Sequence, residues 1–224
     1  MNKQEYKYEL HCHTSDVSFC AHSTAEEAVK FYKERGYDGI VITDHYSPQT
    51  FLLHKAIWPH KYTDMYVKGY KRARECAGDD FTVLLGCEVR FFCTIDDFLI
   101  YGIDEDFLRG AGNLMTKYLR RLFRICDNNG LLLIAAHPFR ELRFRHKPSL
   151  LHGCEVFNGK DKGKKANPKA EKWAEKHGFS IITSGGDFHD KNDTVPGGII
   201  TREPIKTNED LLRILRSGDY TLIK

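Results

Sequence analysis

Histidines and carboxylates follow strand-like segments at both ends of this chain. His11 and His13 lie two residues apart in the apolar run E-L-H-C-H-T, and residues i and i+2 of a strand point to the same face. Asp187 and His189 repeat this spacing near the other end, after a second strand-like run. Two imidazoles side by side pack poorly in a core and are a good start to a metal site.

Three further polar groups stand at the ends of apolar runs between these pairs. They are His45 in T-D-H, Glu88 in G-C-E and His137 in A-H-P. Taken singly, each group has an ordinary explanation, such as a structural histidine, a surface ion pair or a helix cap. Because every group stands at a strand end, we expect all five places to converge.

The candidate ligands are imidazoles and carboxylates only, a mixture that suits Zn, Mn or Fe. They are His11, His13, His45, Glu88, His137, Asp187 and His189. This set exceeds what one tetrahedral ion requires, so we expect two or three ions, with a carboxylate such as Glu88 bridging two of them. Sites of this kind clamp the attacking and leaving oxygens in phosphoester hydrolysis.

Neighbouring residues could complete the site. Asp16 and His22 both lie in the loop after His13, and we favour Asp16 as a further ligand. Asp44 is expected to support the ligands rather than to bind an ion. Arg140 opens a basic stretch after His137 and suits bidentate recognition of phosphate, whereas Arg143 and Arg145 in the same stretch are equally well explained as solvated loop residues.

Bulk properties indicate an ordinary globular protein. The chain has 224 residues, enough for one domain over 1–224, and a net charge of +3, too small to indicate nucleic acid binding by itself. It lacks an apolar run of ~20 residues that would span a membrane. Its first residues lack a signal peptide's apolar core, and its seven cysteines contain no C-x-x-C, so we expect a cytoplasmic protein with reduced thiols.

Short apolar strands alternate with amphipathic helices along the chain, which predicts a parallel sheet with crossover helices. Strands are expected at 6–13, 39–43, 82–85, 98–101, 131–136, 154–157, 180–183 and 199–200. Helices are expected at 24–35, 66–77, 114–128, 168–177 and 208–216, with a long loop over 46–63. About seven strands could close into an α/β barrel, whose active site lies at the carboxyl ends of the strands.

With these motifs in order, the sequence resembles the PHP (polymerase and histidinol phosphatase) superfamily of metal-dependent phosphoesterases. The matching residues run from H-C-H-T at 11–14, through T-D-H, G-C-E and A-H-P-F-R, to G-D-F-H at 186–189. The resemblance implies a distorted (β/α)7 TIM-like barrel with a trinuclear centre. It implies one ion on His11, His13, Glu88 and Asp187, a second on Glu88 and His137, and a third on His45, His189 and a first-loop residue.

Two stretches depart from the family pattern. Many members have another histidine between the glutamate and the H-P motif, and here Asp96 and Asp97 are the candidates for its place. The first loop, T-S-D-V-S-F-C-A-H, differs from the commoner T-x-x-S-D-G form, which leaves the choice between Asp16 and His22 open.

The leading hypothesis is a phosphoesterase acting on a small phosphorylated metabolite, in which a metal-bound hydroxide attacks phosphorus. The ions and Arg140 would neutralise charge on the phosphoryl oxygens, and His45, His189 or a water would protonate the leaving oxygen. The alternatives are a nuclease-type phosphodiesterase on the same barrel, and a metal-binding module without catalysis. The membrane and nucleic acid are not expected partners, and the sequence leaves the oligomeric state open.

Overall fold

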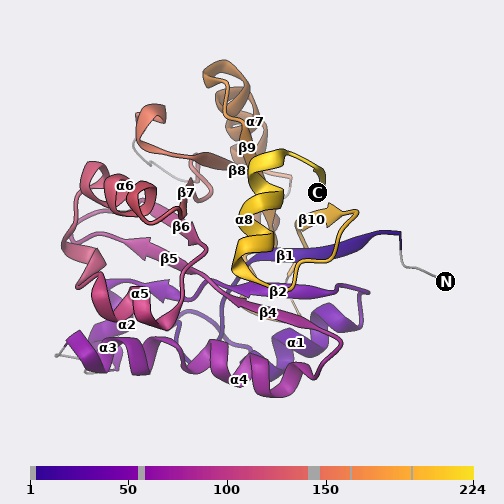
Figure 1. The fold of residues 1–224 in the computed structure, drawn as a ribbon, viewed down its shortest axis with the longest axis horizontal. Helices are drawn as coiled ribbons and strands as arrows, with labels where there is room; N and C mark the ends of the chain where they lie inside the picture. Colours follow the sequence, from indigo (N-terminus) through magenta and orange to yellow (C-terminus); the bar gives the residue numbers. More distant parts are fainter. Residues whose placement is uncertain (1–3, 55–58, 141–146, 162, 193) are drawn as a thin grey trace.

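A computed structural model describes residues 4–54, 59–140, 147–161, 163–192 and 194–224 of the chain, except the side chains of 59–61. Strands and helices alternate along most of it (Figure 1). The strands are β1 (Tyr6–Cys12), β2 (Gly39–Ile42), β3 (His45–Tyr46), β4 (Thr82–Leu85), β5 (Cys87–Arg90), β6 (Asp97–Tyr101), β7 (Leu132–Ala135), β8 (Gly153–Asn158), β9 (Ile181–Gly185), β10 (Gly198–Thr201) and β11 (Tyr220–Ile223).

The helices lie between these strands. They are α1 (Ala25–Lys33), α2 (Pro48–Leu53), α3 (Pro59–Tyr66), α4 (Lys68–Ala77), α5 (Glu105–Gly110), α6 (Leu119–Asn128), α7 (Ala166–His177) and α8 (Asn208–Ser217). Short 3-10 turns occur at Leu114–Thr116, Pro148–Leu150 and Gly159–Asp161. Within the described ranges, no helix has the length and apolar character needed to cross a membrane.

The strands pair into two sheets, in the orders β11-β10-β1-β2-β4 and β3-β5-β6-β7-β8-β9. The α/β class is confirmed, but the expected all-parallel pairing is wrong. β5, β6 and β7 pair antiparallel, as do β1, β10 and β11. The physical reason is chain length at β5–β6, because the segment 91–96 is too short for the crossover that parallel neighbours need. The pairing shows two sheets and does not by itself show a closed barrel.

Both faces of the central strands are buried, which explains their continuously apolar sequences. In β6, Phe98 and Ile100 pack into one apolar cluster, with α6 and α7 residues such as Leu122 and Ala170. Leu99 and Tyr101 of the same strand face a second cluster, with residues of α8. A third cluster lies between β1–β2 and the neighbouring helices α1 and α4, which run side by side in Figure 1.

Two helices occupy part of the segment predicted as a loop over 46–63, so that prediction is wrong. α2 begins at Pro48, with the side chain of Ser47 accepting a hydrogen bond from the backbone N–H of Thr50. α3 begins at Pro59. Proline is favoured in the first turn of a helix, where a backbone N–H has no partner to lose, so these prolines start helices here. The predicted helix over 114–128 begins later, at Leu119, because Lys117 and Tyr118 are extended.

Candidate metal centre

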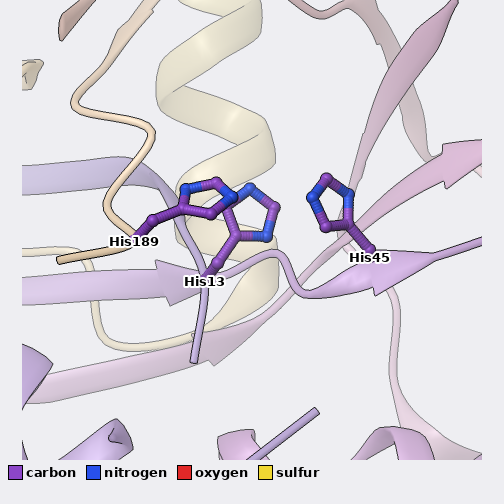
Figure 2. A group of neighbouring side chains, drawn as sticks. All are labelled: His13, His45 and His189. Atoms are coloured by element: carbon purple, nitrogen blue, oxygen red, sulfur yellow. The ribbon is translucent and has the colours of Figure 1, made fainter. Parts of the chain in front are cut away.

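The structure brings the predicted ligands together at the carboxyl ends of strands. His11 is in β1 and His13 follows it, His45 is in β3, Glu88 is in β5, His137 follows β7, and Asp187 and His189 follow β9. All are buried, with exposed fractions from 0% for His11, His13 and Glu88 to 7% for His45. Figure 2 shows the imidazoles of His13, His45 and His189 gathered from three separate segments.

The first group contains the side chains of His11, His13, Glu88 and Asp187. Nε2 of His11 lies 3.4 Å from Glu88 Oε1 and 3.5 Å from Asp187 Oδ1. Nε2 of His13 lies 3.5 Å from Glu88 Oε2 and 3.2 Å from Asp187 Oδ1. Ligands held at about 2.0–2.1 Å in a tetrahedron are about 3.3 Å apart, so this spacing fits one ion.

The second group contains His11, Glu88 and His137, whose ligand atoms lie within 4.8 Å of one another. Nε2 of His137 lies 2.9 Å from Glu88 Oε1. The two candidates for the family's additional histidine do not join this group among the described residues. Asp97 instead accepts hydrogen bonds from Nε and a terminal nitrogen of Arg90, at 2.6 and 2.7 Å, and lies 3.9 Å from His137 Nε2.

The third group contains His13, His45 and His189, with the His13 ring 4.3 Å from each of the other two ring centroids. Neither predicted first-loop ligand joins it. Asp16 Oδ2 accepts a hydrogen bond from the backbone N–H of Ala25 at the start of α1, and the His22 side chain is exposed. A carboxylate that satisfies the first N–H of a helix is turned away from the imidazoles, which is why Asp16 does not reach them.

Cys20 is the first-loop residue that the structure places beside the third group. Its Sγ lies 3.1 Å from Nε2 of His189. Burial opposes ionisation of this thiol, yet hydrogen bonding with His189 and His45 lowers its pKa to about 6. Sequence reasoning missed this residue because a single thiol outside a C-x-x-C pattern resembles any small apolar residue.

In three of the histidines, hydrogen bonds determine which ring nitrogen faces the candidate metal site. Nδ1 of His11 lies 2.8 Å from Glu155 Oε1, and Nδ1 of His189 lies 2.9 Å from the Asp187 carbonyl oxygen. Both partners are acceptors, so Nδ1 is the donor in each contact. Ser18 donates its hydroxyl proton to Asp44, so its contact with His13 requires a proton on His13 Nδ1 as well. Nε2 is therefore the nitrogen that each of these imidazoles, when neutral, offers to a cation.

Buried polar atoms without hydrogen-bond partners lie where the ligands meet. They include Nε2 of His11 and of His13, Nδ1 of His45 and of His137, and Oε2 of Glu88. Glu88 Oε2 does lie 2.7 Å from His45 Nδ1, an ion-pair distance without hydrogen-bond alignment. Leaving buried polar atoms unpaired is costly, and divalent cations would satisfy them. The donor set therefore fits metal ions.

Glu155 is a buried carboxylate beside the candidate ligands that the sequence analysis did not single out. Besides His11, it accepts hydrogen bonds from the backbone N–H of His137 and from the Asn158 side chain. A carboxylate in this position fixes the orientation of a ligand imidazole and makes it a stronger base. The available signal was an acidic residue inside the apolar strand C-E-V-F.

Asp44 supports the site as expected. It accepts hydrogen bonds from the backbone and hydroxyl of Thr14 and from Ser18. Helix α4 approaches this pair closely, since a Cβ on Gly69 would lie 2.2 Å from Thr14 Oγ1. A glycine is therefore required at that position.

Arg140 is bound to protein groups through each arm of its guanidinium. It lies 2.9 Å from Asp161 through Nε, 2.6 Å from Asn158 Oδ1 through one terminal nitrogen and 2.8 Å from Asp187 Oδ2 through the other. In this structure, Arg140 therefore orients the Asp187 carboxylate. Arg143 and Arg145, the other cations of this stretch, lie outside the described residues.

The two buried carboxylates are stabilised in their ionised form by neighbouring histidines and by Arg140. Burial opposes ionisation of Glu88, but His45 and His11 outweigh it and hold its pKa well below the ordinary range. Burial is likewise outweighed at Asp187 by His11 and Arg140, which lower its pKa. Both carboxylates are therefore ionised and available as ligands at neutral pH.

The imidazoles divide into two classes. Burial, together with His189 and His45, lowers the pKa of His13, and burial with Arg140 lowers that of His137. At His45, burial is outweighed by Glu88, which raises the pKa to about 10. His13 and His137 are thus neutral and ready to bind a cation. At His11, burial is outweighed by Glu155, Asp187 and Glu88, which raise its pKa well above the ordinary range, so His11 and His45 must each lose a proton first.

Backbone strain marks the same place. His137 and Asp187 have positive φ angles, 29° and 54°, which residues other than glycine rarely adopt. Strained backbone of this kind persists where the surroundings fix it, and it is concentrated at functional sites.

A mixed α/β fold with buried imidazoles and carboxylates at its strand ends defines a metal-dependent hydrolase class of protein. The PHP domain family model matches residues 9–156, which is more than half of the chain. The chain therefore belongs to the PHP domain family of metal-dependent phosphoesterases, as the motifs predicted. The comparison with curated protein sequences gives no significant match.

Solved structures with the same fold are distant in sequence. One is a two-domain protein from Bacteroides vulgatus containing a predicted PHP-like metal-dependent phosphoesterase, with a TM-score of 0.73, 16% identity and 98% of this chain covered. This chain spans 64% of that protein. PsfC from Pseudomonas syringae has a TM-score of 0.72 and 13% identity, with 99% and 92% of the two chains covered.

A lesion-specific endonuclease from Pyrococcus furiosus is also similar, with a TM-score of 0.62 and 13% identity. The match covers 97% of this chain and 57% of the endonuclease. At these identities the likeness concerns the fold alone.

Proposed function

We propose that this protein is a phosphoesterase that hydrolyses a small phosphorylated metabolite with two or three divalent cations, Zn, Mn or Fe. The observation that supports it most is the arrangement of Nε2 atoms of His11 and His13 with the carboxylates of Glu88 and Asp187, at 3.2–3.5 Å. We assign the first cation to these four residues, a second to Glu88 and His137 with His11 beside them, and a third to His45 and His189 with His13 beside them.

Bound cations would supply Lewis-acid neutralisation of the phosphoryl oxygens and generate the attacking hydroxide from water. Other residues of this chain orient the side chains that would bind the cations. Glu155 keeps the His11 proton on Nδ1, and Ser18 with Asp44 keeps the His13 proton on Nδ1. Arg140 holds Asp187 Oδ2 and leaves Oδ1 toward His11 and His13.

His45 and His189 are the most exposed of the proposed ligands, at 7% and 5%, so they lie nearest the mouth of the site. We propose a ligand role for both in place of the expected proton transfer. Nδ1 of His189 donates to the Asp187 carbonyl, which leaves Nε2 as the atom that would bind a cation, and a nitrogen bound to a cation has no proton to give to a leaving oxygen. We therefore assign protonation of the leaving group to water.

We also infer that the two sheets form one distorted (β/α)7 barrel in a single domain over 1–224. Hydrogen bonds cross both seams between the sheets. At one seam, the backbone N–H of Glu88, in β5, donates to the carbonyl of Asp44, which directly follows β2 and Thr43 of the other sheet. At the other, β1 meets the segment after β9 through hydrogen bonds between His11, His13 and Phe188.

A nuclease-type phosphodiesterase is the second candidate, favoured by the fold likeness to the lesion-specific endonuclease. The net charge of +3 offers little attraction for a polyanion, so we rank it second. A monoester, a diester and single-stranded DNA assayed in parallel would separate the two functions. Turnover of DNA above that of small esters would reverse the ranking.

The test of the first candidate compares wild type with a His11→Ala/His13→Ala variant, each supplied with Mn or Zn. His177→Ala is the matched control, since its side chain is exposed on α7. We expect the double variant to lose hydrolysis of phosphomonoesters and to lose bound metal, and the control to retain both. Equal turnover by wild type and double variant would reject the proposed function.

A further inference from the structure

The third histidine group lacks the first-loop donor that either Asp16 or His22 was expected to supply. Asp16 is bound to the start of α1, and His22 is exposed. The loop between them still lies against the site, because the backbone N–H groups of His22 and Ser23 both donate to the carbonyl oxygen of His189, at 2.7 and 3.0 Å. These bonds hold the loop against the site, with Cys20, two residues before His22, beside the His189 ring.

The thiol of Cys20 faces a ring nitrogen that has a free lone pair. Nδ1 of His189 donates to the Asp187 carbonyl, so in the neutral imidazole the lone pair is on Nε2, which lies 3.1 Å from Cys20 Sγ. The thiol also hydrogen-bonds to His45. A sulfur and a nitrogen bound to one tetrahedral Zn²⁺ would be about 3.5 Å apart, so a small outward shift of the thiol would accommodate the ion.

Independent observations support a cation at this position. Nε2 of His13 and Nδ1 of His45 are buried and have no hydrogen-bond partner. The three rings form a close cluster, with His45 and His189 ring centroids 5.7 Å apart. Three described first-loop side chains contact this cluster. Ser18 lies against Nδ1 of His13 and the Phe19 ring against His45, whereas Cys20 places a sulfur at Nε2 of His189.

We propose that Cys20 is the first-loop metal ligand of this protein, so that the third position is held by one sulfur and imidazole nitrogens. This inference rests on the proposed metal centre and adds to it a choice of cation. Thiolate ligands favour Zn²⁺ over the harder Mn²⁺, so the third position would take Zn²⁺ while the carboxylate-rich first position accepts either ion. The site would consequently be sensitive to thiol oxidation.

The experiment loads the full-length protein with Co²⁺, whose bond to sulfur gives an intense near-ultraviolet charge-transfer band. Four proteins are compared, namely wild type, Cys20→Ser, Cys20→Asp and the matched control Cys76→Ser, whose thiol is partly buried on α4. Bound cobalt and zinc per chain are measured beside the spectra. Thermal melting of each apo-protein checks that the variants are folded.

We expect the band in wild type and Cys76→Ser, and its loss in both Cys20 variants. Cys20→Ser should bind the last ion at least about tenfold more weakly, since even residues that only support a ligand contribute about 10–100-fold to affinity. Cys20→Asp should regain that ion without the band. Zinc should also protect one thiol from labelling in wild type and none in Cys20→Ser.

Two results would overturn the inference. One of them leaves the proposed function standing, and the other rejects that function as well. Cobalt binding that depends on His11 and His13, without a sulfur band or with a band that persists in Cys20→Ser, would reject Cys20 and leave the proposed function standing. Absence of bound metal in every folded protein would reject both.

Discussion

Glu155 determines which nitrogen His11 offers, because its carboxylate oxygen lies 2.8 Å from His11 Nδ1. The same side chain accepts the backbone N–H of His137, so one buried carboxylate orients two candidate ligands. Glu155→Gln retains the size of the side chain but lets it donate a proton to His11 or leave the contact. The proposed ligand would then be misoriented.

For Glu155→Gln we expect metal affinity to fall about 10–100-fold, as for other residues that support a ligand histidine. Competition with a chelator measures it. Glu171→Gln is the control, because its carboxylate is exposed on α7 and pairs with Lys224. Equal affinities in the two variants would show that Glu155 does not orient His11.

His45 makes metal binding depend on pH. Its pKa is raised from 6.5 to about 10 in the metal-free protein, since the attraction of Glu88 outweighs burial. The imidazole is therefore protonated at pH 7 and must release that proton to bind a cation, so affinity should rise with pH. We expect an increase of up to about tenfold per pH unit between pH 6 and 9.

Calorimetry in buffers of different ionisation enthalpy measures the proton released on metal binding. His45→Gln removes one of the two protonated imidazoles and should make the rise of affinity with pH less steep, while His11, whose pKa is also raised, retains part of it. A constant affinity in wild type over this range would contradict the raised pKa of His45.

Helix α1 depends on the first loop at the scale of the element. Thr24 and Glu27 form a capping box, and Asp16 adds a hydrogen bond to the backbone N–H of Ala25. The first backbone N–H groups of a helix have no partner within the helix, so a hydrogen bond to one of them stabilises the helix. An anionic acceptor is also attracted by the positive end of the helix dipole. The structure thus gives Asp16 a structural role in place of the expected ligand role.

Asp16→Ala separates these two roles. We expect the free energy of unfolding to fall by about 1–2 kcal/mol, while the number of bound metal ions stays unchanged. Denaturant titration and metal analysis of the same preparation provide both values. Loss of an ion in this variant would restore Asp16 as a ligand and count against Cys20.

The elements also show what the sequence could predict. Site residues that follow buried strands, such as His45 and His137, could be found because a polar residue after an apolar run ends a strand at the site edge. Glu155 and Cys20 could not be found this way. The first lies inside a strand and the second in a loop, and only tertiary contacts give them partners.

The sequence analysis also did not predict the relative direction of neighbouring strands. The alternation of strands and helices predicts α/β structure, but it does not fix the antiparallel pairing of β5, β6 and β7. The six-residue segment between β5 and β6 was a usable signal, since parallel neighbours need a dozen residues or more between them. Pro48 and Pro59 favour a loop on composition alone, although proline also starts helices, as both do here.

At the scale of the whole molecule, the proposed ligands join the two sheets. His11 and His13 come from one sheet or its edge, and Glu88 comes from the other. Buried Glu9 adds to the seam through hydrogen bonds from Tyr32 and from the backbone of Gly186 and Gly197. Metal ions at this place should therefore tie the sheets together.

Removing metal should lower the stability of the whole chain. A ligand that binds only the folded state adds about 2.7 kcal/mol when its free concentration is 100 times its dissociation constant. We expect the thermal midpoint to fall when EDTA is added and to recover with Zn or Mn. The His11→Ala/His13→Ala variant should respond little to EDTA. An unchanged thermal midpoint of the wild-type protein would show that bound metal does not stabilise the fold.

The most direct measurement of the central claim is a crystal structure with anomalous scattering recorded at the absorption edges of Zn, Mn and Fe. We predict two or three anomalous peaks, the first in contact with His11, His13, Glu88 and Asp187. A peak between His45 and His189 would test the third position. A well-ordered structure of metal-supplemented protein without a peak at the first position would contradict the proposed metal centre.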